Sequence, residues 1–181
     1  MKKVHVIVMA LGLAGVAAAD GRVSNPGFEA LTEKKGAADW ESFFVREKGK
    51  GRVEVSGERH AGERSVRIVH EGEKDWALTN DRKTKVKAGE SYRVSCWMKR
   101  NGEARSGAVH VVGFKGDKLV DWAIGETPQA TGEGWKMCQS YFTVPEEVDT
   151  VFVRIVGSGK ADFCVDDVQL EAGTPPAFLK G

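Results

Sequence analysis

Short runs in which apolar and polar residues alternate recur along almost the entire chain. In residues 92–99, for instance, Tyr92, Val94, Cys96 and Met98 fall on one side of the run. Alternation with a period of two is typical of β-strands that bury one face. No window of ten or more residues carries the apolar spacing of an amphipathic helix. The sequence therefore predicts an all-β protein, an antiparallel β-sandwich or jelly roll.

We expect about nine or ten strands in this sandwich, joined by tight turns. Glycine is abundant, with 22 residues against five prolines, and pairs such as Asn101-Gly102 lie between the alternating runs. Glycine supplies the backbone conformations that tight turns require. The clearest strand candidates are residues 40–45, 65–69, 92–99, 107–114, 118–124, 135–144, 150–156 and 161–170.

Length and charge narrow the function classes. A chain of 181 residues is long enough for one domain with a sizeable core. We place this domain at residues 20–172, followed by an extended tail at residues 173–181. The formal net charge is only +1, which does not favour binding to nucleic acid. We expect a monomer without a nucleic-acid partner.

The first 19 residues have the features of an export signal. Lys2 and Lys3 precede an apolar stretch at residues 4–16, and three small residues at 17–19 follow it. We expect cleavage before Asp20 and a secreted or periplasmic protein. The stretch is shorter than the ~20 residues that a bilayer requires, and no second apolar run follows, so no membrane span is expected.

Three cysteines remain after this segment: Cys96, Cys138 and Cys164. Their number allows at most one disulfide, and their spacing lacks the C-x-x-C pattern of zinc or dithiol sites. Each lies in an alternating run at the parity of apolar neighbours. We therefore interpret them as small buried hydrophobic residues.

Motifs that would identify an enzyme are missing from the sequence. The three histidines beyond the export segment, His60, His70 and His110, form no H-E-x-x-H pattern, and no G-x-S-x-G or P-loop occurs. Paired carboxylates for glycoside hydrolysis stay open, because two acids can come from any two strands. A catalytic role is therefore the minority hypothesis.

Five motifs in a particular order resemble one family. They are Asn25-Pro26-Gly27-Phe28-Glu29, Gly57-x-x-His60-x-Gly62-x-x-Ser65-Val66, Ala88-Gly89-x-x-Tyr92-x-Val94-Ser95-x-Trp97, Trp135 leading to Phe142-Thr143-Val144-Pro145, and Val165-Asp166-Asp167-Val168-x-Leu170. This order is similar to the cellulose- and xylan-binding type of carbohydrate-binding module, a galactose-binding-domain-like β-jelly roll often attached to secreted glycoside hydrolases. The resemblance spans about residues 22–172.

The resemblance implies a structural calcium ion held by Glu29 and Asp166. Calcium prefers six to eight oxygen ligands at about 2.3–2.6 Å, which carboxylates and loop carbonyls supply. Asp166 also has the parity of Cys164, Val168 and Leu170, so we expect it to face the core, where a charge must be paired or metal-bound. The alternative is an arginine partner or a hydrogen-bonded turn.

A sugar-binding groove needs exposed aromatic rings with polar neighbours. Four residues are candidates: Trp76 and Trp122 as stacking rings, and His110 and Arg154 as polar groups. Each also has a structural explanation, since tryptophans in small sandwiches commonly pack and Arg154 can pair with a nearby acid. Packing roles are assigned to three further tryptophans, Trp40, Trp97 and Trp135.

These observations favour a secreted, non-catalytic module that binds polysaccharide through an open aromatic groove. A structural or adhesive extracellular sandwich without a sugar site is the first alternative, and a small glycan-active hydrolase or lyase is the second. Lysine and arginine are abundant in the chain, whereas asparagine and glutamine are scarce in the expected groove strands. Acidic polysaccharides therefore belong among the ligands to test.

Overall fold

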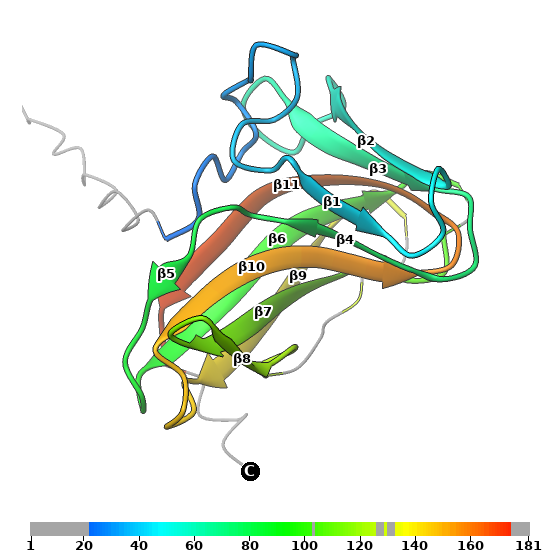
Figure 1. The fold of residues 1–181 in the computed structure, drawn as a ribbon. Coiled ribbons are helices and arrows are strands. Elements are labelled where there is room, and N and C mark those ends of the chain that lie inside the picture. The colour runs from blue at the N-terminus through cyan, green and yellow to red at the C-terminus, as the bar shows by residue number, and fades with distance from the viewer. Residues whose placement is uncertain (1–21, 103, 126–128, 130–132, 175–181) are drawn as a thin grey trace, which may run out of the picture.

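The computed structural model describes residues 22–102, 104–125, 129 and 133–174, and within them the chain forms two antiparallel β-sheets packed face to face (Figure 1). The expected signal segment and residues 175–181 of the expected tail lie outside the described residues. The fold class predicted from the alternation is confirmed. Among the described residues, no helix is long and apolar enough to cross a membrane.

One sheet has the order β1-β4-β10-β7-β8, with the short β5 paired to β10, and the other has the order β2-β3-β11-β6-β9. The strands are β1 (Ser42–Val45), β2 (Gly51–Ser56), β3 (Ser65–His70), β4 (Asp75–Thr79), β5 (Thr84–Lys85), β6 (Ser91–Arg100), β7 (Ala108–Lys115), β8 (Lys118–Asp121), β9 (Trp135–Thr143), β10 (Thr150–Ser158) and β11 (Ala161–Ala172).

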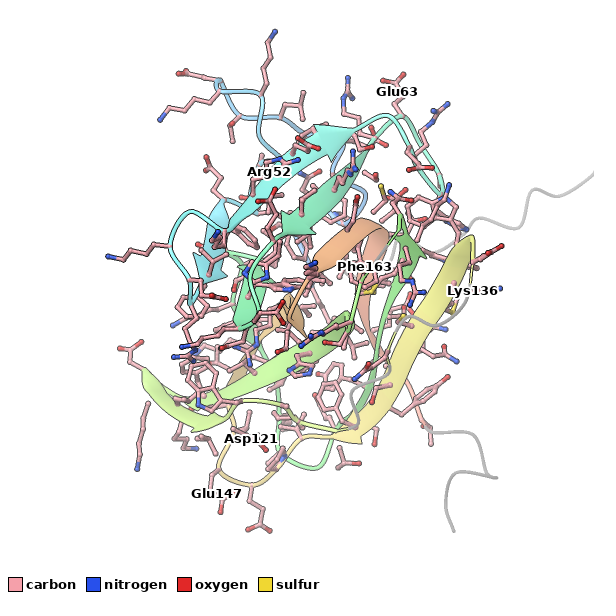
Figure 2. The ribbon with its side chains drawn as sticks, turned by 90° about the vertical axis from the view of Figure 1, so that its right-hand side faces the viewer. Arg52, Glu63, Asp121, Lys136, Glu147 and Phe163 are labelled. Atoms are coloured by element: carbon pink, nitrogen blue, oxygen red, sulfur yellow. The ribbon has the colours of Figure 1, made fainter. Side chains whose placement is uncertain are left out.

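The core lies between the two sheets, where each strand contributes alternate residues. In β6, the side chains of Tyr92, Val94, Cys96 and Met98 are at most 1% exposed, as their shared parity predicts. Opposite them, Val109 and Val111 of β7 are fully buried. Figure 2 shows Phe163 of β11 in the interior between the sheets. One contiguous hydrophobic core therefore supports both outer faces.

The expected strands are present, with four differences beyond shifts of one or two residues at strand ends. β2, β4 and the two-residue β5 are strands that the sequence interpretation omitted. The expected strand at residues 118–124 ends at Asp121, because the Asp121 side chain accepts a hydrogen bond from the Ala123 amide at 2.9 Å and turns the chain. This turn leaves Trp122 outside the ladder, on the surface.

Strand β11 contains a β-bulge that changes which residues face the core. The register with β6 shifts between Asp166 and Gln169, and Asp167 adopts a positive φ of 49°. Phe163 and Val165 therefore face the core before the bulge, and Val168 faces it afterwards. The expectation that Asp166 shares the face of Val168 is wrong: Asp166 lies on the outer side of the sheet.

The cysteines are buried, as expected, and all three are free thiols. Cys96 and Cys138 are directly opposed on β6 and β9, inside the core. Cys164 lies on the outer side of β11 beneath Glu58 and Asn101, whose side chains approach its sulfur to 3.5 and 3.2 Å. The bulge explains this difference, because the parity that links Cys164 to the later core residues does not hold across it.

Both ends of the described chain attach to the beginning of β6. The Arg22 guanidinium donates to the Tyr92 hydroxyl at 3.1 Å, and the Gly173 amide donates to the Ser91 carbonyl at 3.0 Å. The Thr84 hydroxyl adds a third bond, to the Arg22 carbonyl, at 2.5 Å. In Figure 1 the first described residues and the end of β11 accordingly lie at the same side of the sandwich.

Candidate functional site

A groove of about 670 Å³ lies on the outer face of the β1-β4-β10-β7-β8 sheet. This volume is in the range of small-ligand sites. Most of the strand residues that line it have the parity that points away from the core, such as Ala77 on β4, Arg154 on β10 and His110 on β7. The alternation that buries one face of each strand therefore also assembles the groove.

Small side chains form the floor of the groove, and aromatic ones stand beside it. Ala77, Val156 and Ala108 are successive partners on β4, β10 and β7, so they form one row across the sheet. Phe44 of β1 continues this row beyond Ala77 and is 49% exposed. Because alanines lie where larger side chains would fill the space, the sheet is hollowed there.

Trp122 is the most exposed aromatic residue of the site, and the half-buried Arg154 packs against it. The Trp122 ring is 59% exposed, and the Arg154 guanidinium lies 4.9 Å from its centroid. Arg154 also donates from Nη2 to the Trp122 carbonyl at 3.0 Å. This contact combines a cation–π interaction with a hydrogen bond, which holds the indole at the edge of the groove.

His110 is the direct neighbour of Arg154 across β7 and β10. Burial, and secondarily the positive charge of Arg154, lower the pKa of His110 to about 4. The imidazole is therefore neutral at physiological pH. Burial alone lowers the pKa of Arg154.

Buried polar atoms without a hydrogen-bond partner concentrate at this groove. Of the five such side-chain atoms in the described part of the chain, three belong to groove residues: Arg154 Nε, His110 Nδ1 and Trp76 Nε1. Native proteins leave few buried polar groups unpaired, so a cluster of them needs an explanation. For the half-buried His110 and Arg154, a ligand seated in the groove is one explanation, whereas Trp76 Nε1 belongs to a core side chain.

Trp76 is not an open stacking ring. Its side chain is 1% exposed, belongs to the core and lies 6.4 Å from the Phe163 ring, centroid to centroid. Gly157 on the neighbouring β10 leaves room for the indole, because a Cβ at position 157 would overlap the ring. The platform role expected for Trp76 is therefore corrected: the ring supports the groove floor from beneath.

Sequence reasoning did not select Phe44 or the ion pair between Arg46 and Asp75. Arg46 donates from Nε and Nη2 to the two Asp75 carboxylate oxygens at 2.5 and 2.9 Å. A signal for Phe44 was available, since Phe44 occupies the outward parity between the core-packed Phe43 and Val45. The ion pair joins residues 29 positions apart and carries no local signal.

The two expected calcium ligands lie on either side of the loop at residues 60–64. Asp166 is 1% exposed and its Oδ2 accepts from the amides of His60 and Ala61 at 2.8 and 3.1 Å. Glu29 Oε1 accepts from the amides of Glu63 and Arg64 at 2.7 and 3.1 Å. The hydrogen-bonded turn weighed as the alternative for Asp166 is thus present.

These residues match calcium in chemistry but are not gathered as a cage. A Cβ placed on Gly27 would lie 3.8 Å from Oδ1 of both Asp166 and Asp167, so carboxylate oxygens converge near it. Burial raises the pKa of Asp166, whereas amide hydrogen bonds lower that of Glu29. No group of three or more His, Cys, Asp or Glu side chains that could hold a metal occurs among the residues described here.

The remaining tryptophans have mainly packing roles, as expected. Trp40 is 2% exposed and contacts Phe28, with ring centroids 5.1 Å apart. On the outer face of the other sheet, the His60 ring stacks on Trp97 at 3.9 Å and meets Trp135 edge-on at 5.9 Å. His60 thereby covers Trp97, fastening the loop to the sheet.

The chain is thus a two-sheet antiparallel sandwich with a hollow on one outer face, beside which Phe44 and Trp122 lie. The family model CBM_4_9, a carbohydrate binding domain, matches residues 21–161. The chain belongs to this carbohydrate-binding family of jelly-roll modules. No curated protein matches it significantly.

Solved structures with similar folds include several carbohydrate-binding modules. The CBM22-1 xylan-binding domain of Paenibacillus barcinonensis Xyn10C has a TM-score of 0.53 at 16% identity, covering 83% of this chain and 93% of that one. TmCBM61 in complex with β-1,4-galactotriose has a TM-score of 0.51 at 19% identity, covering 84% and 98%. The tailspike protein 4 enzymatically active domain of bacteriophage CBA120 reaches 0.64 at 10% identity, covering 84% and 21%.

Proposed function

We propose that the protein is a non-catalytic module that binds polysaccharide in the groove between Phe44 and Trp122. The observation that carries this proposal is the coincidence of an exposed indole with unpaired polar atoms at one hollowed sheet face. Pyranose rings stack on indole faces, and their hydroxyl groups supply acceptors and donors. The xylan-binding activity named for the CBM22-1 structure supports a glycan as the ligand class.

The acid content of the groove favours binding over hydrolysis. Glycoside hydrolysis commonly uses two carboxylates about 5–10 Å apart. Among the described lining residues, Asp75 is the single acid, and Arg46 occupies both of its oxygens. We therefore assign no catalytic residues to this face.

Calcium remains part of the proposal as a structural ion near Glu29 and Asp166. Bound there, it would compensate the buried charge of Asp166 and link the N-terminal segment to β11. Melting curves of the full chain with calcium and with a chelator test this directly. We expect a higher melting temperature with calcium that Asp166→Asn abolishes, whereas identical curves would remove calcium from the proposal.

We also propose export, with residues 1–19 as the signal. The basic start, apolar stretch and small residues support it. Expression of the full chain in a bacterium, followed by N-terminal sequencing of the periplasmic and culture fractions, should yield a protein beginning at Asp20. An intact N-terminus confined to the cytoplasm would contradict this assignment.

Affinity electrophoresis of the full chain tests sugar binding. The gels contain xylan, β-glucan, a soluble cellulose derivative, pectin or alginate, and we expect at least one polymer to retard the protein. Trp122→Ala should abolish the retardation while leaving the melting temperature nearly unchanged, since the ring is exposed. Met137→Ala is the matched control, because Met137 is 45% exposed on the opposite sheet. Unretarded migration of folded protein in every gel would favour a structural or adhesive role.

A further inference from the structure

The charged groups that line the groove do not balance. Arg46 and Asp75 neutralise each other through two hydrogen bonds, at 2.5 and 2.9 Å. His110 is neutral, because its pKa is about 4. Arg154 is the remaining charged lining residue, and no carboxylate pairs with it in the part of the chain that the structure describes. Among the described lining residues, one positive charge is therefore uncompensated.

This charge is held where it is poorly solvated. Arg154 is half-buried, its Nε is buried without a hydrogen-bond partner, and one of its other nitrogens is used by the Trp122 carbonyl. A partly buried charge without a counter-ion costs free energy, and an anion bound in the groove would recover that cost. With Nε buried and Nη2 bonded to the Trp122 carbonyl, Nη1 is the guanidinium nitrogen left to donate a charge-assisted hydrogen bond to a carboxylate.

The surroundings of Arg154 restrict the anion to one carried by a sugar. The guanidinium lies 4.9 Å from the Trp122 ring, whose side chain is 59% exposed and open to a pyranose. His110, directly opposite on β7, lies beside the guanidinium without adding charge. One cation beside one stacking ring matches one negative charge per sugar.

We propose that the groove recognises a uronate, with Trp122 stacking on its pyranose ring and Arg154 pairing with its carboxylate. This inference rests on the proposed function, since it names the ligand class of the same groove. It also explains why half-buried Arg154 has no acidic partner within the described chain.

The first test compares polymers that differ only in the carboxylate. Affinity electrophoresis of the full chain is run in polygalacturonate, alginate and glucuronoxylan, and in each after chemical reduction of its carboxyl groups to alcohols. We expect retardation by at least one native polymer, weakened about tenfold or more by reduction, because one charge-assisted contact contributes on that scale. Glucuronoxylan carries its uronate on a branch, whereas polygalacturonate and alginate carry theirs in the backbone. Comparing the three gels therefore shows which position of the uronate the groove recognises.

The second test changes the protein and compares two variants that have the same net charge. Arg154→Gln should lose about tenfold or more in affinity for the native polymer and little for its reduced form. Arg52→Gln is the control, since Arg52 is exposed on β2 of the other sheet (Figure 2) and its loss changes the net charge equally. If Arg154→Gln fails to fold, weakening of wild-type retardation by added salt in native but not in reduced gels provides the same comparison.

Three results would overturn the uronate assignment. Equal retardation by native and reduced polymers would leave sugar binding intact but remove the carboxylate. Equal losses in Arg154→Gln and Arg52→Gln would reduce the effect to overall charge. Stronger retardation by dextran sulfate than by any uronate polymer would assign the groove to sulfate esters. Failure of every polymer to retard folded protein would instead contradict the proposed function itself.

Discussion

The stability of the protein should fall as the pH is lowered from about 7 to about 5, because His110 must stay neutral in the folded state. Its pKa drops from 6.5 to about 4 on folding, chiefly through burial. A base whose pKa is lower in the folded state makes its full contribution to the free energy of unfolding at pH values above its unfolded-state pKa. That contribution is lost progressively as the pH falls toward the folded pKa.

The size of this effect follows from the two pKa values. One unit of pKa difference corresponds to about 1.4 kcal/mol, so the shift of His110 amounts to about 3 kcal/mol at most. At pH 5 the unfolded state is mostly protonated and the folded state is not, which gives a loss of about 2 kcal/mol. For a domain of this size, we expect the melting temperature to fall by about 4–8 °C.

Urea denaturation at a series of pH values, for the wild type and for His110→Gln, measures this contribution. Subtracting the two profiles removes all other titrating groups and should leave the slope of His110. Parallel profiles between pH 7 and pH 5 would refute the reasoning, since the imidazole would then titrate equally in both states. An NMR titration of the His110 ring in the wild type gives the folded pKa independently of the variant.

Three further results are expected. Trp76→Ala should lower the free energy of unfolding by about 3–5 kcal/mol in urea denaturation, because it removes a buried ring; a change below about 1 kcal/mol would contradict its core position. Gly157→Ala should cost about 1–3 kcal/mol, because the added Cβ would overlap that ring. Gly57→Ala, with nothing within 4 Å of the added Cβ, is its control and should be nearly neutral. The Arg46 guanidinium lowers the pKa of Asp75 below 3.8. The ion pair therefore stabilises the folded protein above that pH, and this stabilisation is lost as the pH falls below it. Asp75→Asn should flatten the acid denaturation profile in this pH range.

Local alternation predicted most of the fold, because the side-chain period is a property of each strand. It also identified the inward face of β6 correctly. β2 was omitted although Val53 and Val55 alternate with charged neighbours. β4 shows no alternation, because its three central residues, Trp76, Ala77 and Leu78, are all apolar and all buried.

The site was predicted in part, and the two wrong predictions, for Trp76 and Asp166, have a common cause. Trp122, His110 and Arg154 converge in one groove: His110 and Arg154 lie at outward strand positions, and the turn after Asp121 brings Trp122 beside them. For Trp76 the parity of β4 was needed, and that strand had not been recognised. For Asp166 the parity was carried across a bulge, which only the pairing of β11 with β6 defines. Both errors concern tertiary register, which a single sequence does not encode locally.

The attachment of both described chain ends to Ser91 and Tyr92 has a consequence for the connectivity of the molecule. Ends on the same side of a domain tolerate being joined by a linker, and the chain can then be opened elsewhere. A short linker from residue 174 to residue 22, with a new opening at Gly116 in the turn between β7 and β8, would give a circular permutant with every strand intact. The same proximity suits the module for insertion into a surface loop of a host protein, where it would add a binding face without separating the flanking segments.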